Sequence, residues 1–430
     1  MAGAPEEPRT TGGRPKARIG SLLPPLPIAV AAIVITPVAL LRVRVYLVDF
    51  WQGRSGGDFA EYYVAALIGR ARGWPAVYDI GLYRSALHSL TGNLDVFVNL
   101  PLAAWVALPF TLLPFPAADR LWQTALLVLF IATWRASTTG SEWVRAALML
   151  AALASFPVFF AIHLGQLVLA VAALLVLHWR LLRAGHPVLA GIALGLAFVK
   201  PQDVLLVPVA LLLSGRWKAA ASCAATVAVL GGGVLLALGP PGIHAYQSSL
   251  TYEMAREFYV RHTLPGHLPS GTALAIIRPV ILALALAPAI LTGARRYERA
   301  LAAAVLGGFL LTPYLNAEDL TLLFLCAWLL LGTETPAWMR LAMAVSYPVV
   351  AFENVLWAPL LLGVELVWLA LLASEAITSA ERGPWLPWKG RPGQPVPTAR
   401  ERSARNANAS SQTTSTLSGG NGPAGKATAT

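Results

Sequence analysis

Apolar segments recur along residues 22–376 of this chain, and the charged residues gather between them and at the two ends. A membrane-crossing helix needs roughly 20 apolar residues, or fewer when the helix is broken and shielded by its neighbours. Of the 430 residues, 57% are hydrophobic and 12% are charged, and the mean hydropathy is +0.63. The sequence therefore predicts an all-helical membrane protein that crosses the bilayer many times, with no large soluble domain.

The basic residues indicate topology. The net charge of +11 would suit a nucleic-acid binder, but Lys and Arg lie at the ends of apolar segments and in the two termini. Such clusters mark cytoplasmic loops. The clusters expected to face the cytoplasm are Arg180 with Arg183, Arg216 with Lys218, and Arg295 and Arg296 with Arg299. If both termini are cytoplasmic, the number of crossings is even, and the apolar segments then predict about twelve crossings. Because the basic residues are explained as topology signals, no nucleic-acid partner is predicted.

The two ends of the chain are expected to be cytoplasmic. Residues 1–21 form a basic N-terminus, and the apolar run 22–41 is too long for the core of a signal peptide, which favours a retained helix. Residues 377–430 are rich in Pro, Ser, Thr, Gly, Asn and Arg and predict a disordered tail.

Between the ends, residues 22–376 form the predicted membrane domain, with external loops at 49–98 and 239–270. The segment 100–115 carries several prolines and predicts an interfacial or re-entrant helix rather than a full span. Short apolar arms flank polar corners at 163–166, 200–203 and 313–319. Arms of about a dozen residues cannot cross a bilayer upright, so these corners are expected to face a buried cavity.

Asp58 is the candidate base. Apolar residues follow it at helical spacing, which predicts an amphipathic helix over 59–70 lying on the outer face. Asp58 then falls at the N-cap, with Glu61 completing a capping box. A capping role and a catalytic role both remain open, because the Gly56-Gly57 approach leaves the carboxylate uncovered and able to accept a proton.

Other polar residues carry similar alternatives. Lys200 either snorkels to the interface or binds a phosphate as a buried point charge. His163 and Gln166 either cap and turn the chain or contact a substrate. Asp319 is either an acid at a helix N-terminus or part of the site with Asn316. Arg256 and Arg261, in the second external loop, offer a phosphate or sugar clamp.

No cofactor and no metal site are predicted, and the metal dependence of the protein stays open. Cys223 and Cys326 both lie in apolar runs, and His262 and His267 lack nearby ligands in a metal-binding pattern. The sequence has no Walker loop, Rossmann fingerprint or Ser-His-Asp ordering, which argues against ATP-driven transport.

The order of several motifs resembles glycosyltransferase family 87. The motifs are Asp58-Phe-x-x-Tyr62-Tyr63, Asn99-Leu-Pro101, Gly165-Gln166, the glycine-rich run ending in Lys200-Pro201, and Thr312-Pro313-Tyr314 followed by Asp319-Leu320. The family consists of membrane enzymes of the GT-C class, among them α-(1→2)-mannosyltransferases that use polyprenyl-phosphate-mannose. The resemblance covers roughly residues 50–331.

The resemblance implies a GT-C fold and an inverting single displacement with Asp58 as the base. It implies a donor site lined by Lys200, Gln166 and the corner at 313–319. The candidate substrate-binding residues are His163, Gln166, Lys200, Tyr62, Asn99, Arg256, Arg261, Tyr314, Asn316 and Asp319. Leu100 stands where the family often has a proline, and residues 314–316 where it often has a histidine.

The implied function is transfer of a hexose, with mannose as the family-level expectation, from a polyprenyl-phosphate sugar to a lipid or glycan acceptor. The site would face outwards from the cytoplasmic membrane of a bacterium, and a monomer among membrane lipids is expected. Two alternatives stay open: a transporter or flippase of lipid-linked sugars, and a non-catalytic subunit of envelope assembly.

Overall fold

The computed structural model describes residues 26–255, 262–268, 271–356 and 358–381, and these residues form helices and no strands. The α-helices are α1 (Leu26–Gln52), α2 (Gly57–Arg72), α3 (Ile80–Thr91), α4 (Pro101–Ala107), α5 (Phe115–Ser137), α6 (Glu142–Ala154), α7 (Phe156–Leu164), α8 (Val168–Arg183), α9 (Pro187–Leu196), α10 (Pro201–Val204), α11 (Val207–Leu213), α12 (Trp217–Met254), α13 (Leu264–His267), α14 (Thr272–Thr292), α15 (Tyr297–Leu311), α16 (Thr321–Leu331), α17 (Ala337–Ala351) and α18 (Ala358–Glu381). The 3₁₀ turns are η2 (Trp74–Tyr78), η3 (Leu108–Leu112), η4 (Ala197–Val199), η6 (Gly293–Arg296) and η7 (Ala317–Leu320).

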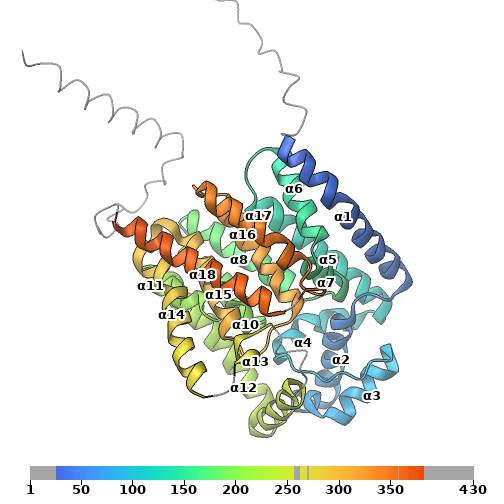
Figure 1. The fold of residues 1–430 in the computed structure, drawn as a ribbon. Helices are drawn as coiled ribbons and strands as arrows, with labels where there is room; N and C mark the ends of the chain where they lie inside the picture. Colours follow the sequence, from blue (N-terminus) through green and yellow to red (C-terminus); the bar gives the residue numbers. More distant parts are fainter. Residues whose placement is uncertain (1–25, 256–261, 269–270, 357, 382–430) are drawn as a thin grey trace, which may run out of the picture. The chain divides into compact units, whose positions relative to one another are not determined.

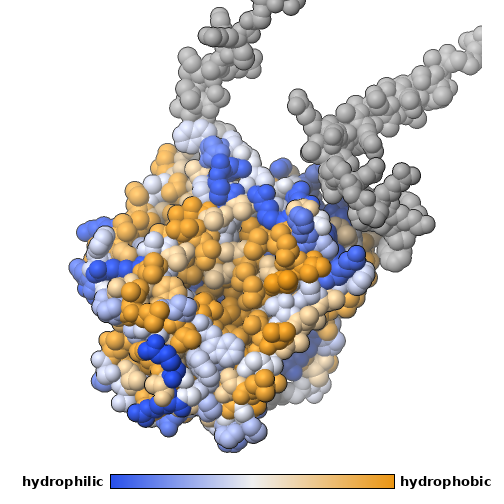
Figure 2. Space-filling model, turned by 180° about the vertical axis from the view of Figure 1, so that it is seen from behind, coloured by the Kyte–Doolittle hydropathy of each residue, from blue (hydrophilic) through white to orange (hydrophobic). Residues whose placement is uncertain are grey.

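The described helices suit a multi-pass membrane protein. Five helical stretches are long and apolar enough to cross a bilayer, and a sixth follows if α6 and α7, bent by 70°, form one span. Many large apolar side chains on these helices point outwards, among them Val229 and Leu236 on α12 and Val367 on α18. Figure 2 shows such hydrophobic residues over the middle of one face, with hydrophilic residues towards its rims. Apolar surface on this scale is stable only against lipid.

The predicted count of about twelve crossings is not confirmed. The difference arises at the polar corners, where the apolar arms are short: α7 has 9 residues, α11 has 7 and α16 has 11. The segment after Leu100 forms α4 and η3, which are together too short for a full span, in agreement with the prediction. The predicted second external loop begins as helix, because α12 continues past a kink at Gly239 to Met254.

Close helix packing explains the glycine-rich run before Lys200. A Cβ at Gly191 would collide with Ser222 and Ala219, and a Cβ at Gly195 would collide with Thr226. Small residues at this spacing let α9 lie against α12 at backbone contact distance. The helices α9 and α12 therefore pack side by side, and Figure 1 shows two further packed pairs, α1 beside α6 at one edge of the view and α14 beside α18 at the other.

The predicted basic clusters meet at one end of the helices. Arg183 pairs with Glu298 at 3.6 Å, and Arg216 donates to the carbonyl of Ala294 at 3.1 Å. These contacts lie at the first turn of α15 and at η6 directly before it, and the other end of α15 leads into the polar corner at 313–319. At 1.5 Å per residue, the 15 residues of α15 separate the basic end from that corner by roughly 22 Å.

Candidate functional site

A polar cavity of about 190 Å³ lies between α2, the corner that joins α7 to α8, the start of α10 and the segment before α16. Carboxylates and amides dominate its polar lining. These residues are Asp58, Glu61, Asp95, Asn99, Gln166, Lys200, Gln202, Glu253, Tyr314, Asn316 and Glu318. The cavity therefore unites positions that lie up to 260 residues apart in the chain.

Glycine brings Asp58 to the cavity wall. Gly56 adopts φ 80°, a left-handed conformation, and its amide donates to the carbonyl of His163 at 2.8 Å. A Cβ at Gly56 would collide with Asp119 and Gln123. The loop before α2 is thus fixed to the corner between α7 and α8, and Asp58 enters the cavity as the second residue of the helix.

The predicted N-cap role of Asp58 is wrong. Gly56 is the N-cap residue, no side chain caps the helix, and the amide of Ala60 bonds to the carbonyl of Gly56 at 2.9 Å. The glycine pair lets the helix begin earlier than the polar residues suggest. The carboxylate of Asp58 instead accepts a hydrogen bond from Gln166 Nε2.

The predicted surface position of this helix is also wrong. Phe59 and Tyr62 are fully buried, and the ring of Phe59 stacks on Trp122 at 4.8 Å between centroids. The helix packs on α3, α4 and α5, so its apolar stripe faces protein rather than lipid. Asp58 and Glu61, three residues apart, lie on one face of α2, and that face forms the cavity wall.

Gln166 connects the cavity residues through both atoms of its amide. Its Oε1 accepts hydrogen bonds from Tyr62 Oη at 2.8 Å, from Lys200 Nζ at 3.2 Å and from its neighbour's amide at 2.8 Å. Its Nε2 donates to Asp58 Oδ2 and to Glu318 Oε1, the latter at 3.0 Å. With 3% of its surface exposed, Gln166 holds the candidate base and the lysine in fixed relation.

Lys200 is a buried cation, which excludes the snorkelling alternative and leaves the interpretation as a buried point charge. The residue is 2% exposed and lies between the end of η4 and Pro201, the first residue of α10. Its Nζ forms an ion pair with Asp319 Oδ1, which is itself fully buried. A charge at this depth is stable only with such a partner, and the ammonium group still lines the cavity.

The corner before α16 supplies the opposite wall. Asp319 also accepts a hydrogen bond from the main-chain amide of Asn316 at 3.3 Å. Its carboxylate therefore holds both the turn before α16 and the ammonium group of Lys200 in place. Glu318 lies beside it, and burial together with the charge of Asp319 raises the pKa of Glu318 to about 8. Burial likewise raises the pKa of Tyr314. Glu318 therefore holds a proton at neutral pH more readily than an exposed glutamate.

The structure gathers most of the predicted site residues. Gln166, Lys200, Asn99, Tyr314 and Asn316 line the cavity with Asp58, while Tyr62 and Asp319 support it from behind. His163 does not reach the cavity, since its ring stacks on Phe159 and its Nδ1 lies 3.9 Å from Asp49. Arg256 and Arg261 lie outside the described residues.

Sequence reasoning missed several acids of the site. Glu61 was assigned to a capping box, although its spacing of three residues from Asp58 already placed the two on one face. Asp95 and Glu253 line the cavity from a loop and from the end of α12, and no motif marks either. Asp203 was not missed in the same way, because it belongs to the predicted polar corner 200–203, where it is 1% exposed and lies one turn after Lys200.

The arrangement suits a hydroxyl-rich ligand near a proton acceptor. Carboxylates outnumber the single lysine in the polar lining, and carboxylate oxygens accept hydrogen bonds from sugar hydroxyls. Among the described residues, no group of three His, Cys, Asp or Glu side chains is arranged to hold a metal ion.

Comparison with known proteins agrees with this chemistry. The family model for glycosyltransferase family 87 matches residues 97–317, just over half of the chain. The chain belongs to glycosyltransferase family 87. It is therefore a membrane glycosyltransferase, and the family match contains Asn99, Gln166, Lys200 and Asn316. Asp58 precedes the matched segment and joins it only through the cavity. No curated protein and no solved structure matches this family 87 member.

Proposed function

We propose that this family 87 member transfers a hexose, with mannose the first candidate, from a polyprenyl-phosphate sugar to a lipid or glycan acceptor. The reaction takes place at the outer face of the cytoplasmic membrane within a GT-C fold. The observation that carries the proposal is the joint placement of Asp58 and Lys200 on one cavity, connected through Gln166.

The mechanism is a single displacement with inversion. Asp58 accepts the proton of the acceptor hydroxyl while the hydroxyl oxygen attacks the anomeric carbon. The bond from that carbon to the phosphate oxygen breaks, and polyprenyl phosphate leaves. The ammonium group of Lys200, held by Asp319, stabilises the negative charge of the leaving phosphate.

Asp58→Asn tests the base assignment. The substitution keeps the size of the side chain and its contact with Gln166, and removes the proton acceptor. General-base catalysis contributes roughly 10²–10⁴ in rate, so transfer of labelled hexose from a polyprenyl-phosphate sugar in membranes is expected to fall by that factor while the protein still accumulates.

Asp79→Asn is the matched control. Asp79 lies in the same predicted external loop, where it caps α3 by accepting from the amide of Leu82 at 3.0 Å, and it does not line the cavity. Transfer by this variant should stay at the level of the unmodified protein. Undiminished transfer by Asp58→Asn would remove Asp58 from the mechanism. If lipid-linked sugar crossed reconstituted vesicles without any transfer, the transporter alternative would replace the proposal.

A further inference from the structure

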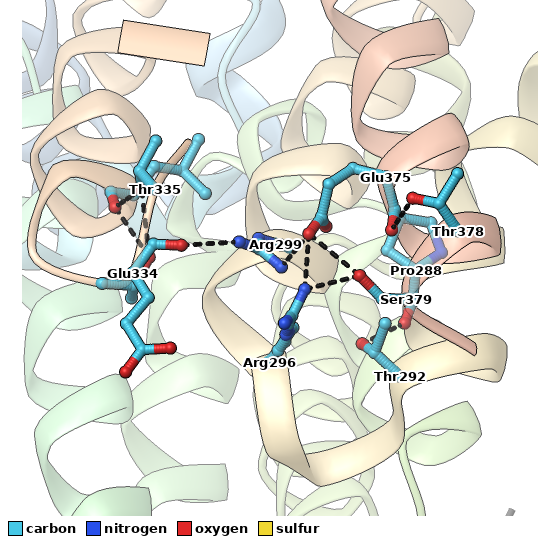
Figure 3. A network of polar contacts seen from close by, with 11 residues as sticks. Pro288, Thr292, Arg296, Arg299, Glu334, Thr335, Glu375, Thr378 and Ser379 are labelled. Carbon is cyan, nitrogen blue, oxygen red and sulfur yellow. Dashed lines mark hydrogen bonds and ion pairs between the residues drawn. The ribbon is translucent and has the colours of Figure 1, made fainter. Parts of the chain in front are cut away.

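A second polar cluster lies at the basic end of the helices, away from the catalytic cavity. Arg296 and Arg299 both bond to one oxygen of Glu375 on α18 (Figure 3). Arg299 Nη1 lies 2.5 Å from Glu375 Oε1, and Ser379 Oγ donates to the same atom at 3.0 Å. Arg299 Nη2 also bonds to the main-chain carbonyl of Glu334 at 3.1 Å. These contacts tie α15 to α18.

One atom of this cluster is left without a partner. Glu375 is only 9% exposed, and its Oε2 is buried and accepts no hydrogen bond from the described residues. A buried carboxylate oxygen without a donor costs free energy, so such atoms are usually satisfied by a water or a ligand. Glu375 thus presents an acceptor that the protein itself does not use.

Arg296 has hydrogen-bond donors that the described residues do not use. Its side chain is 40% exposed, against 3% for Arg299, and its Nη1 bonds to Glu375 and Ser379. Its Nε and Nη2 make no hydrogen bond to the described residues, so the guanidinium keeps donors for an anion. Arg299 is nearly fully buried and uses both of its terminal nitrogens in contacts with the protein, which makes it the structural member of the pair.

Both groups border a cavity of about 300 Å³ between α15, α18 and the start of α17. The cavity contains equal numbers of opposite charges, with Arg296 and Arg299 balanced by Glu334 and Glu375. Trp338, 44% exposed, also lines it, and exposed tryptophans are enriched at the depth of the lipid headgroups. The charge balance favours a zwitterionic ligand over a net anion.

We propose that this cavity binds the phosphoethanolamine headgroup of a membrane lipid. The phosphate accepts hydrogen bonds from the free donors of Arg296, and the ammonium group donates to Glu375 Oε2. The basic clusters at this end place the lipid in the cytoplasmic leaflet. A choline headgroup lacks the N–H donors for Glu375, and a glycerol headgroup lacks the positive charge.

Lipid binding by the purified full-length protein tests the proposal. The protein is stripped of lipid in detergent and titrated with phosphatidylethanolamine, phosphatidylcholine or phosphatidylglycerol of identical chains, with bound lipid counted by native mass spectrometry. The ethanolamine lipid is expected to bind about tenfold more tightly than the other two, the size of one charge-assisted hydrogen bond. Equal binding of all three, or stronger binding of phosphatidylglycerol, would overturn the proposal.

Arg296→Ala is expected to weaken ethanolamine-lipid binding tenfold or more. Arg340→Ala is the control, because Arg340 is an exposed arginine on α17 that does not line the cavity. An equal effect of the two substitutions would reduce the site to a general attraction between arginine and lipid, and would refute a specific site.

Glu375→Gln separates lipid binding from the contacts that tie α15 to α18. The amide keeps an acceptor for the arginines but removes the charge that holds the ammonium group, so the preference for ethanolamine over choline should disappear. Thermal unfolding in detergent without lipid measures only how much the contacts between α15 and α18 contribute to stability. A variant that keeps the preference contradicts the assigned role of Glu375, and if the variant fails to fold, Arg296→Ala and the headgroup series decide.

Discussion

Replacing Gln166 with leucine tests the idea that one amide orients the whole site. Leucine has nearly the same volume, so the packing is kept while five hydrogen bonds are lost. Two of these involve the charged groups Asp58 and Lys200, and hydrogen bonds to charged groups contribute about 1.5–3 kcal/mol each. The gross loss of hydrogen-bond free energy is therefore about 3–6 kcal/mol, and hydrogen bonds to water in the cavity offset part of this loss.

The rate should fall less than in Asp58→Asn, because the base stays present and loses only its orientation. We expect a decrease of roughly 10–100-fold in kcat, which corresponds to about 1.4–2.7 kcal/mol of transition-state stabilisation. Tyr62→Phe removes a single neutral hydrogen bond to Gln166 and should lower kcat less than tenfold. The assay is hexose transfer in membranes at several donor concentrations, so that kcat and KM are separated.

His178→Leu is the matched control for lost buried polarity. His178 is fully buried on α8, twelve residues after Gln166, and bonds to the carbonyl of Ala190 and to Tyr297 Oη. It lies roughly 18 Å along the helix from the cavity. If both leucine variants lost transfer equally and in proportion to their thermal stability, or if Gln166→Leu kept the full kcat, the orienting role of Gln166 would be refuted.

Asp319→Ala should lower the free energy of unfolding by about 3–5 kcal/mol, because it leaves Lys200 buried without its counter-charge. The double variant with Lys200→Met should recover stability but not transfer. Thermal unfolding measures the stability of both variants, and the hexose-transfer assay measures their activity. Gly56→Ala should reduce both stability and transfer, whereas Gly53→Ala, which has φ 67° but open space around its Cβ position, should cost only the backbone strain of about 1 kcal/mol. Equal losses in the two glycine variants would contradict the steric argument. Glu318 has a pKa of about 8 in the folded protein against 4.5 in the unfolded chain, so its contribution to stability is complete below pH 4.5 and is lost as pH rises to 8. Glu318→Gln should flatten that decline in unfolding measurements from pH 5 to pH 8, and an unchanged pH dependence would show that another group causes it.

Much of the site could be read from the sequence because a membrane chain hides few polar residues. Lys200, Gln166 and Asn316 stand out as polar residues between apolar arms, and all three line the cavity. Asp58 stood out for the same reason, although its predicted capping role was wrong. Glu61 and Glu253 could not be distinguished from ordinary loop or capping residues, because nothing local separates a carboxylate that faces water from one that faces a cavity.

The sequence by itself determined that the protein is an all-helical membrane protein, because hydropathy and the placement of charges act locally along the chain. The motif order that resembles family 87 is also a property of the linear sequence. Only the tertiary structure decided where α2 lies, packed on α3, α4 and α5 rather than on the outer face. It alone placed Gln166 between Asp58 and Lys200, since a hydrogen bond between residues 108 positions apart depends on the packing of every helix between them.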